Sequence, residues 1–466
     1  MADAMNSSFK QGEYMAEKLK FKEKIGYSFA ALGSDFTTQF TGSFLSYFYT
    51  DVAGIGAGIS GTIMSLSVIW DAINDPLIAS WADNHRFKNG ERIRPLLLYS
   101  SFPFAICLLL LFTTLPNASV SLRAAYAFGW YFIYMIPRTF YFLPIFTMRQ
   151  IATPDLEERV KLNQFISYGQ AVGSSLPTLI MWPVIKKVAG LAADGKTMIN
   201  EGKGFFVAAL IAAIVVILCS LYNYFTTKER VFPEKQEKTR IIDAFRILFK
   251  NKNFVRNLIL FFFYGVCVTL CTGYALRYSK YVIGNLNLPT YMGAMFIVGT
   301  VLATPFVKGM FNKLGRNKTL IIGSMVLAFG AVLFLIFSRV MYVAMFFAFC
   351  IGVGTAITII VIGINRGDVT DVAEFQSGKR MDGMVSNVTS FVKKFAHALL
   401  TAVLGWTLEF SGYDGNLTDQ PLSAQNTIIL LMGVGILVSA IMMAVMSSKL
   451  TIDDEVKEMK TARGNA

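Results

Sequence analysis

The 466-residue sequence is poor in charged residues and histidine, and it lacks compact catalytic motifs. Charged residues make up 16% of the chain, whereas soluble globular proteins carry about 25%. The two histidines, His85 and His397, are too few and too far apart to indicate a metal centre. A glycine-rich loop ending in Gly-Lys-Ser/Thr, a Ser/His/Asp arrangement and a zinc-ligand spacing are all missing. The chain is therefore predicted to be neither an ATP-driven transporter nor an enzyme.

The sequence also lacks the cysteine pattern of a disulfide-bonded protein and the leader of a secreted one. Its five cysteines all fall inside apolar stretches, which predicts neither a disulfide framework nor a metal cluster. The first 24 residues are polar and lysine-rich and do not match a cleaved signal peptide. We expect the first apolar span to act as an uncleaved anchor.

Hydrophobic residues are abundant, at 54% of the chain, and long apolar stretches recur throughout. Windows of about 20 residues indicate twelve stretches that are long enough to cross a bilayer as helices. The fold class is therefore predicted to be an all-α integral membrane protein with twelve transmembrane helices. The spans run at 25–49, 57–82, 95–115, 122–148, 163–185, 204–226, 254–278, 289–309, 319–337, 341–364, 384–410 and 425–447.

The formal net charge is +13, and lysine and arginine cluster in loops between the apolar spans. The positive-inside rule explains such loops in a membrane protein, so no nucleic-acid partner is expected. Loops after even-numbered spans are basic, although the loop after span five is basic as well. We expect a multi-pass protein of the cell (inner) membrane, in contact with lipid, with cytoplasmic N- and C-termini.

The spans form two groups of six, separated by the longest polar stretch, residues 228–253. Within that linker, apolar residues at 241, 245, 248 and 249 suit a helix on the cytoplasmic membrane surface, and a solvated linker fits equally well. Short basic loops at 82–92 and 309–318 echo each other weakly, as in the two-bundle fold of major facilitator transporters. The predicted organisation is a tail (1–24), a six-helix bundle (25–227), the linker (228–253), a second six-helix bundle (254–447) and a second tail (448–466).

Three polar side chains interrupt the second apolar span, in Trp70-Asp71-Ala72-Ile73-Asn74-Asp75-Pro76. On a helix, Asp71, Asn74 and Asp75 stand at i, i+3 and i+4 and share one face. An acid within the membrane costs roughly 2.5–3.5 kcal/mol, and two acids on one face also repel each other. A bound cation would relieve both costs, while pairing with basic residues of neighbouring helices would make the acids a structural lock.

Arg138 lies in the middle of the fourth span, where an unpaired guanidinium would be very costly. Pro137 before it favours a kink that lines a cavity. We expect Arg138 to face the bundle interior, either paired with an acid or holding an anionic substrate group. The candidate acids are Asp35 of the first span, Asp71 and Asp75.

In the second bundle, Lys393 and Lys394 lie within span eleven, and one of them should face the cavity. Residues 366–383 before that span combine several acids with a basic pair and are interpreted as a cytoplasmic loop with internal salt bridges. Such a network would close an inner gate, and a solvated loop is the alternative. The gating candidates are Asp368, Asp371, Glu374 and Arg380.

Four stretches, at 47–52, 70–76, 90–95 and 368–383, together resemble the glycoside-pentoside-hexuronide:cation symporters. These form the branch of the major facilitator superfamily that includes the melibiose permease, and the resemblance covers essentially the whole chain. It implies two six-helix bundles, with a substrate site between the halves, and a coupling cation. The ion is expected to be Na⁺ or H⁺, with Li⁺ as a further candidate.

The resemblance also implies the residues of the two binding sites. The cation ligands would be Asp71, Asn74, Asp75 and Thr139, an all-oxygen set suited to a hard cation such as Na⁺. The family's helix-eleven lysine matches Lys393, and its sugar-binding acid of helix one matches Asp35.

The chain departs from the family at the sugar site. Phe142 stands where the permease has an acid that grips sugar hydroxyls, and Arg138 takes the place of a tyrosine. An aromatic residue that stacks on the sugar is kept as Phe146. These changes make the cavity more positive and suit a uronide or another anionic sugar. The alternative is a purely structural ion pair between Arg138 and Asp35.

These observations predict a secondary active transporter that couples inward Na⁺ or H⁺ movement to uptake of a sugar or glycoside. The coupling ion is the only non-substrate ligand expected, and no cofactor is implied. A transporter of a lipid or other amphiphile on the same fold is the alternative, and a non-transporting membrane sensor is a third reading.

Overall fold

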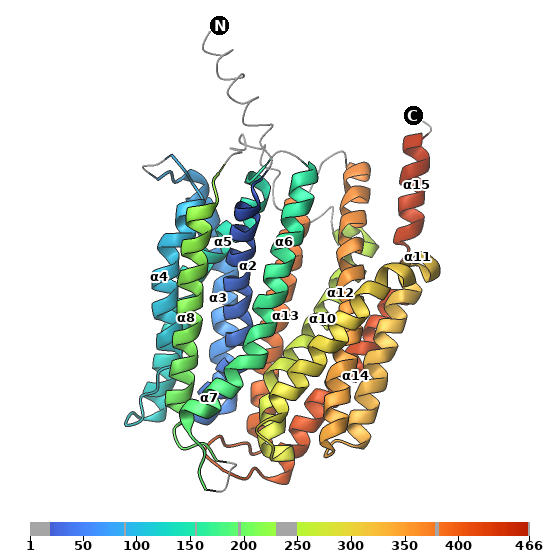
Figure 1. Ribbon diagram of the computed structural model, residues 1–466. Coiled ribbons are helices and arrows are strands. Elements are labelled where there is room, and N and C mark those ends of the chain that lie inside the picture. Colours follow the sequence, from blue (N-terminus) through green and yellow to red (C-terminus); the bar gives the residue numbers. More distant parts are fainter. Residues whose placement is uncertain are drawn as a thin grey trace. The chain divides into compact units, whose positions relative to one another are not determined.

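The computed structural model describes residues 19–87, 90–153, 156–193, 197–229, 249–377 and 382–464 (Figure 1). Regular structure in these ranges is helical, apart from one antiparallel bridge between Leu191 and Met198. The predicted all-α class is thereby confirmed. Most of the N-terminal tail and residues 241–248 of the expected interfacial helix lie outside the described residues.

The chain divides into two units, which are described separately. The first unit takes in residues 1–55 and 69–236. Helix α3 (Ala57–Asn84) contributes its larger part to this unit, and its first turns, up to Val68, belong to the second. The other elements of the first unit are α2 (Phe21–Tyr47), η1 (Phe48–Val52), α4 (Arg94–Leu111), α5 (Val120–Ile151), α6 (Leu156–Leu176), η2 (Pro177–Met181), α7 (Trp182–Ala189) and α8 (Glu201–Thr226).

The second unit takes in residues 56–68 and 237–466. In this unit, glycine allows the start of α3 to approach the helix that carries Thr401 closely. A Cβ on Gly61 would lie 2.6 Å from the carbonyl oxygen of Thr401. The remaining elements of this unit are α10 (Lys252–Arg277), η3 (Tyr278–Ile283), α11 (Leu288–Ile336), α12 (Met341–Ser377), α13 (Asp382–Phe410), α14 (Leu422–Ser448) and α15 (Ile452–Gly464).

Two predicted loops are largely helical. The loop expected at 309–318 is reduced to a break at Gly315, whose φ of 79° and ψ of 172° divide α11 into two helical segments. Residues 366–377, also interpreted as a loop, continue α12. Val369 and Val372 are buried there at helical spacing, so the apolar face of α12 continues past the hydrophobic span. A hydropathy window detects the membrane-spanning length and not the helix itself, which explains both errors.

Six described segments are long and apolar enough to cross a membrane. They are 94–111, 201–226, 252–283, 288–336, 341–372 and 422–462. Helices α3 and α5, which carry Asp71, Asp75 and Arg138, are not among the six. The structure is therefore that of an all-helical multi-pass membrane protein, without fixing the number of spans at twelve.

In the first unit, α2 packs closely against α6 because α6 presents Gly169 and Gly173 one turn apart. A Cβ at Gly169 would clash with the carbonyl oxygen of Ser28, and one at Gly173 with that of Leu32. Small residues at this spacing let helix backbones approach within a membrane.

An ion pair joins the same two helices near their ends. The ammonium of Lys24 lies 2.7 Å from the carboxylate of Glu158, and its hydrogen bond holds the pKa of Glu158 below the usual range.

We predict that Gly169→Leu lowers the thermal unfolding midpoint of the detergent-purified protein by several degrees. The added side chain meets backbone of α2, and overpacking of this kind costs about 1–3 kcal/mol. The control is Gly129→Leu in α5, because a Cβ at Gly129 meets nothing within 4 Å. Equal midpoints for the two variants would show that the α2–α6 contact does not depend on these glycines.

Candidate cation-binding site

Helix α3 presents the three predicted polar residues on one buried face. Asp71 and Asn74 are 2% and 3% exposed, and Asp75 is half-buried. Pro76 lies within the helix directly after them. The i, i+3, i+4 spacing read from the sequence therefore places two carboxylates and an amide where water is largely excluded.

Helix α5 supplies the hydroxyl on which these side chains converge. The Thr139 Oγ1 lies 2.9 Å from a carboxylate oxygen of Asp75 and 3.2 Å from one of Asp71. Asn74 donates to the same hydroxyl over 3.1 Å, through its side-chain nitrogen Nδ2. The structure thus brings together all four predicted cation ligands, from two helices.

The convergence leaves more acceptors than protons. A threonine hydroxyl has one hydrogen to donate, and three oxygens lie within hydrogen-bonding distance: one each from Asp71 and Asp75, and the Met135 carbonyl oxygen at 3.1 Å. Two of the three must therefore go without that proton at any moment. Electron-rich oxygens that meet in this way form a setting that favours a cation, and their chemistry fits a hard ion.

Arg138 is the neighbour of Thr139 on α5 and reaches the same carboxylate. Its Nη1 lies 3.2 Å from one oxygen of Asp71, and the Thr139 hydroxyl contacts the other oxygen. The Asp71 carboxylate is thus shared between an arginine and a threonine. The guanidinium carbon also sits 4.6 Å from the centre of the Phe142 ring, a cation–π contact one turn further along the helix. Of the three acids expected to partner Arg138, Asp71 does so.

An aromatic pair and a backbone oxygen complete the surroundings. Trp70 stacks on Phe132 with ring centres 4.4 Å apart, which fixes α3 against α5 beside the polar cluster. The Met135 carbonyl accepts from Asn74 over 3.4 Å as well as from Thr139. Sequence reasoning missed Met135 because its side chain is apolar and only its backbone oxygen takes part.

The other predicted substrate residues have more varied positions. Asp35 lies on α2, half-buried, and accepts from the Ser34 hydroxyl over 3.3 Å. Phe146 on α5 is 56% exposed. Lys393 belongs to α13, but its side chain lies outside the described residues.

Of the gating candidates, Asp368 lies on α12 and pairs with Arg316 of α11, 2.5 Å away. Asp371 is exposed, whereas Arg380 and the side chain of Glu374 lie outside the described residues. The sequence signal for Arg316 was the basic loop at 309–318, where it was one of several basic residues.

Arg316 is the centre of a cluster that joins three helices of the second unit. It is buried, and besides Asp368 it contacts Asp453 of α15 at 3.0 Å and the amide oxygen of Asn365 at 2.7 Å. Asn365 in turn donates to Asn257 of α10. The segment predicted only as a C-terminal tail therefore contributes an ion pair to the helical unit.

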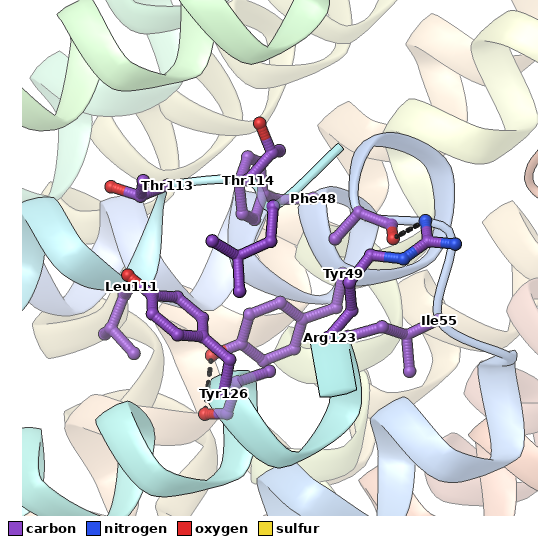
Figure 2. A pocket seen from close by; sticks show the side chains of 11 residues that line it. Phe48, Tyr49, Ile55, Leu111, Thr113, Thr114, Arg123 and Tyr126 are labelled. Atoms are coloured by element: carbon purple, nitrogen blue, oxygen red, sulfur yellow. Dashed lines mark hydrogen bonds between the residues drawn. The ribbon is translucent and has the colours of Figure 1, made fainter. Parts of the chain in front are cut away.

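A small cavity of the first unit lies away from the polar cluster (Figure 2). It is large enough for about one water molecule. Arg123 at its edge donates to the Ala53 carbonyl oxygen over 2.6 Å, and Tyr49 and Tyr126 form part of its wall. None of the predicted cation or substrate residues lines it, so it is no candidate for a sugar site.

A family described as MFS/sugar transport protein matches residues 26–454. The chain belongs to this family. The chain is also 30% identical over 429 residues to the "Putative glycoside/cation symporter YagG" of Escherichia coli (strain K12), which covers 89% of this chain and 88% of the relative. It is 25% identical over 419 residues to the "Glucuronide carrier protein homolog" of the same strain, covering 87% of each.

Solved structures show the same fold. The crystal structure of a D-xylose-proton symporter superposes with a TM-score of 0.64 at 16% identity, over 91% of this chain and 97% of the other. Membership of the MFS/sugar transport family makes the chain a membrane transporter and not an enzyme, as the sequence indicated.

The Arg316 cluster provides a stability test in this MFS/sugar transport protein. We predict that Arg316→Gln lowers the unfolding midpoint in detergent, because removing one partner of a buried ion pair costs about 3–5 kcal/mol; partial exposure of Asp368 and Asp453 places the expected loss at the low end. Arg366→Gln is the control, an exposed arginine of the same α12 end. If both variants unfold at the wild-type temperature, the cluster contributes nothing to stability.

Proposed function

We propose that this chain is a secondary active symporter that couples inward movement of Na⁺ or H⁺ to uptake of a sugar or glycoside. The convergence of Asp71 and Asp75 on the Thr139 hydroxyl carries the proposal. The names of its relatives support it, since they describe a glycoside/cation symporter and a glucuronide carrier homolog. The same names do not favour the amphiphile alternative.

In this proposal Asp71, Asn74, Asp75 and Thr139 hold the coupling ion, Na⁺ or Li⁺ in the case of a metal. A bound cation would offset the repulsion between two carboxylates on one helix face. Trp70 and Phe132 keep α3 and α5 in register, so that the ligands from both helices stay in place. Linkage then requires that substrate tightens ion binding as much as the ion tightens substrate binding.

The proposed substrate surface lies on α5 next to this site. Arg138, Phe142 and Phe146 stand at i, i+4 and i+8 and share one helix face, with a charge at one end and aromatic rings beyond it. Asp35 and Lys393 are assigned to substrate by the family resemblance. The arrangement offers a sugar ring an aromatic platform and offers a hydroxyl or an acidic group the guanidinium.

We further propose twelve spans in two six-helix bundles, cytoplasmic termini in the inner membrane, and alternating access by rocking of the bundles. The break at Gly315 supports the count, because it converts the 49-residue α11 into two helical segments. Asp368, Asp371, Glu374 and Arg380 stay our candidates for the inner gate. The pair of Asp368 with Arg316 supports a role for that end of α12 in holding one state.

We predict that Asp71→Asn and Asp75→Asn each abolish cation-stimulated uptake in proteoliposomes. Either change removes one of the two charges that make the site attractive to a cation. Uptake of radiolabelled methyl β-D-glucoside and methyl β-D-glucuronide is measured under an inward Na⁺ gradient, an inward H⁺ gradient and no gradient.

Asp454→Asn is the matched control, because it neutralises an exposed carboxylate of α15 and should leave the stimulation unchanged. Stimulation that persists in Asp71→Asn or Asp75→Asn would refute the cation-site assignment.

A further inference from the structure

We propose that Arg138 is a tethered counterion of Asp71, which competes with the coupling cation and moves to the acidic group of an anionic sugar when that sugar binds. This inference rests on the proposed symport function and names the substrate class of the same site. It follows from the way in which Asp71 is shared, from the position of the guanidinium and from the balance of charge.

The contact between Arg138 and Asp71 is long. It joins one guanidinium nitrogen to one carboxylate oxygen over 3.2 Å, whereas charge-assisted bonds are usually about 2.7–2.9 Å and often form in pairs. The other oxygen of Asp71 lies 3.2 Å from the Thr139 hydroxyl. When Arg138 moves, the carboxylate keeps its contact with Thr139, and Arg138 no longer competes with a cation for the other oxygen.

The guanidinium is accessible, but the carboxylate is not. The side chain of Arg138 is 21% exposed and that of Asp71 only 3%. The ring of Phe142 also contacts the guanidinium, whose carbon lies 4.6 Å from the ring centre. An entering acidic group thus meets Arg138 before Asp71, and its ring would lie along the row that leads from Phe142 to the exposed Phe146.

Arginine is suited to this role because it does not lose its proton within proteins. Its charge can leave Asp71 only by movement of the side chain. A carboxylate ligand offers the same bidentate geometry as Asp71 or better, since both of its oxygens can face the guanidinium. A neutral sugar offers no charge in exchange and leaves the pair with Asp71 in place.

The exchange links ion binding to substrate binding through charge. An anionic sugar alone adds one negative charge to a region that already holds two carboxylates, and a cation alone meets the competing guanidinium. When both bind, the added charges cancel and each has a partner: the sugar acid has Arg138, and the cation has Asp71. Each ligand therefore favours the other, which is the condition for coupled transport.

The test measures alkali-cation binding as well as uptake. The unfolding midpoint of the detergent-purified protein is titrated with NaCl or LiCl, with choline chloride holding ionic strength constant. Arg138→Gln is expected to lower the half-saturating Na⁺ or Li⁺ concentration about tenfold or more, within the 5–150-fold range of typical site coupling. Arg138→Lys keeps the charge and should stay near wild type.

Arg123→Gln is the control on the same helix, since Arg123 donates to a backbone carbonyl and should leave the titration unchanged. In a second arm, methyl β-D-glucuronide should lower the half-saturating concentration of wild type about tenfold, and methyl β-D-glucoside should not. The difference between the two sugars should vanish in Arg138→Gln.

Equal titrations for wild type and Arg138→Gln would overturn the competition, as would the absence of alkali-cation binding in both. Equal effects of the two sugars, or no effect of either, would overturn the exchange with an anionic substrate. These results do not test symport itself, which the gradient experiment tests. Wild-type uptake that neither a Na⁺ nor an H⁺ gradient stimulates would count against symport.

Discussion

Two carboxylates on one buried helix face set the main constraint on the first unit. Asp71 and Asp75 are one turn apart, so their charges repel, and the burial of Asp71 removes much of the water that would otherwise screen this repulsion. Three polar groups surround the carboxylates and offset this cost. They are a hydroxyl from α5, an amide from the same face of α3 and a guanidinium next to the hydroxyl. We propose that a coupling cation binds in this cluster, where two carboxylates meet one hydroxyl.

The same constraint explains why α3 and α5 are built as they are. Trp70 and Phe132 stack beside the cluster and set the separation of the two helices. The first turns of α3 meet α13 through glycine in the second unit, where Gly61 lies against the backbone of Thr401. One helix therefore carries both the residues that we propose as cation ligands and a close backbone contact at its first turns.

The sequence predicted the residues of the polar cluster better than it predicted which of them pairs with Arg138. Helical spacing alone placed Asp71, Asn74 and Asp75 on one face, because the geometry of a helix is fixed. The family resemblance added Thr139, and the cost of an unpaired charge in the membrane required a partner for Arg138. The choice of Asp71 over the other acids depends on rotamers and helix separation, which no single segment encodes.

Elements outside the apolar spans were predicted less well. Hydropathy reports where a chain is apolar, so it missed the extension of α12 to Ser377 and reduced α15 to a tail. The ion pair between Arg316 and Asp453 joins residues 137 positions apart, and only packing brings them together. The role of the Met135 carbonyl was missed for a different reason, because a backbone oxygen has no signature in the sequence.

We propose that the Thr139 hydroxyl joins the two carboxylates into one cation site. The most direct measurement is the Na⁺ and Li⁺ dependence of the unfolding midpoint for Thr139→Val and Thr139→Ser. Valine keeps the volume and removes the oxygen, so we expect it to weaken cation binding at least about tenfold, while serine keeps the oxygen and should bind as wild type does. Equal cation binding by the valine and serine variants would contradict the account.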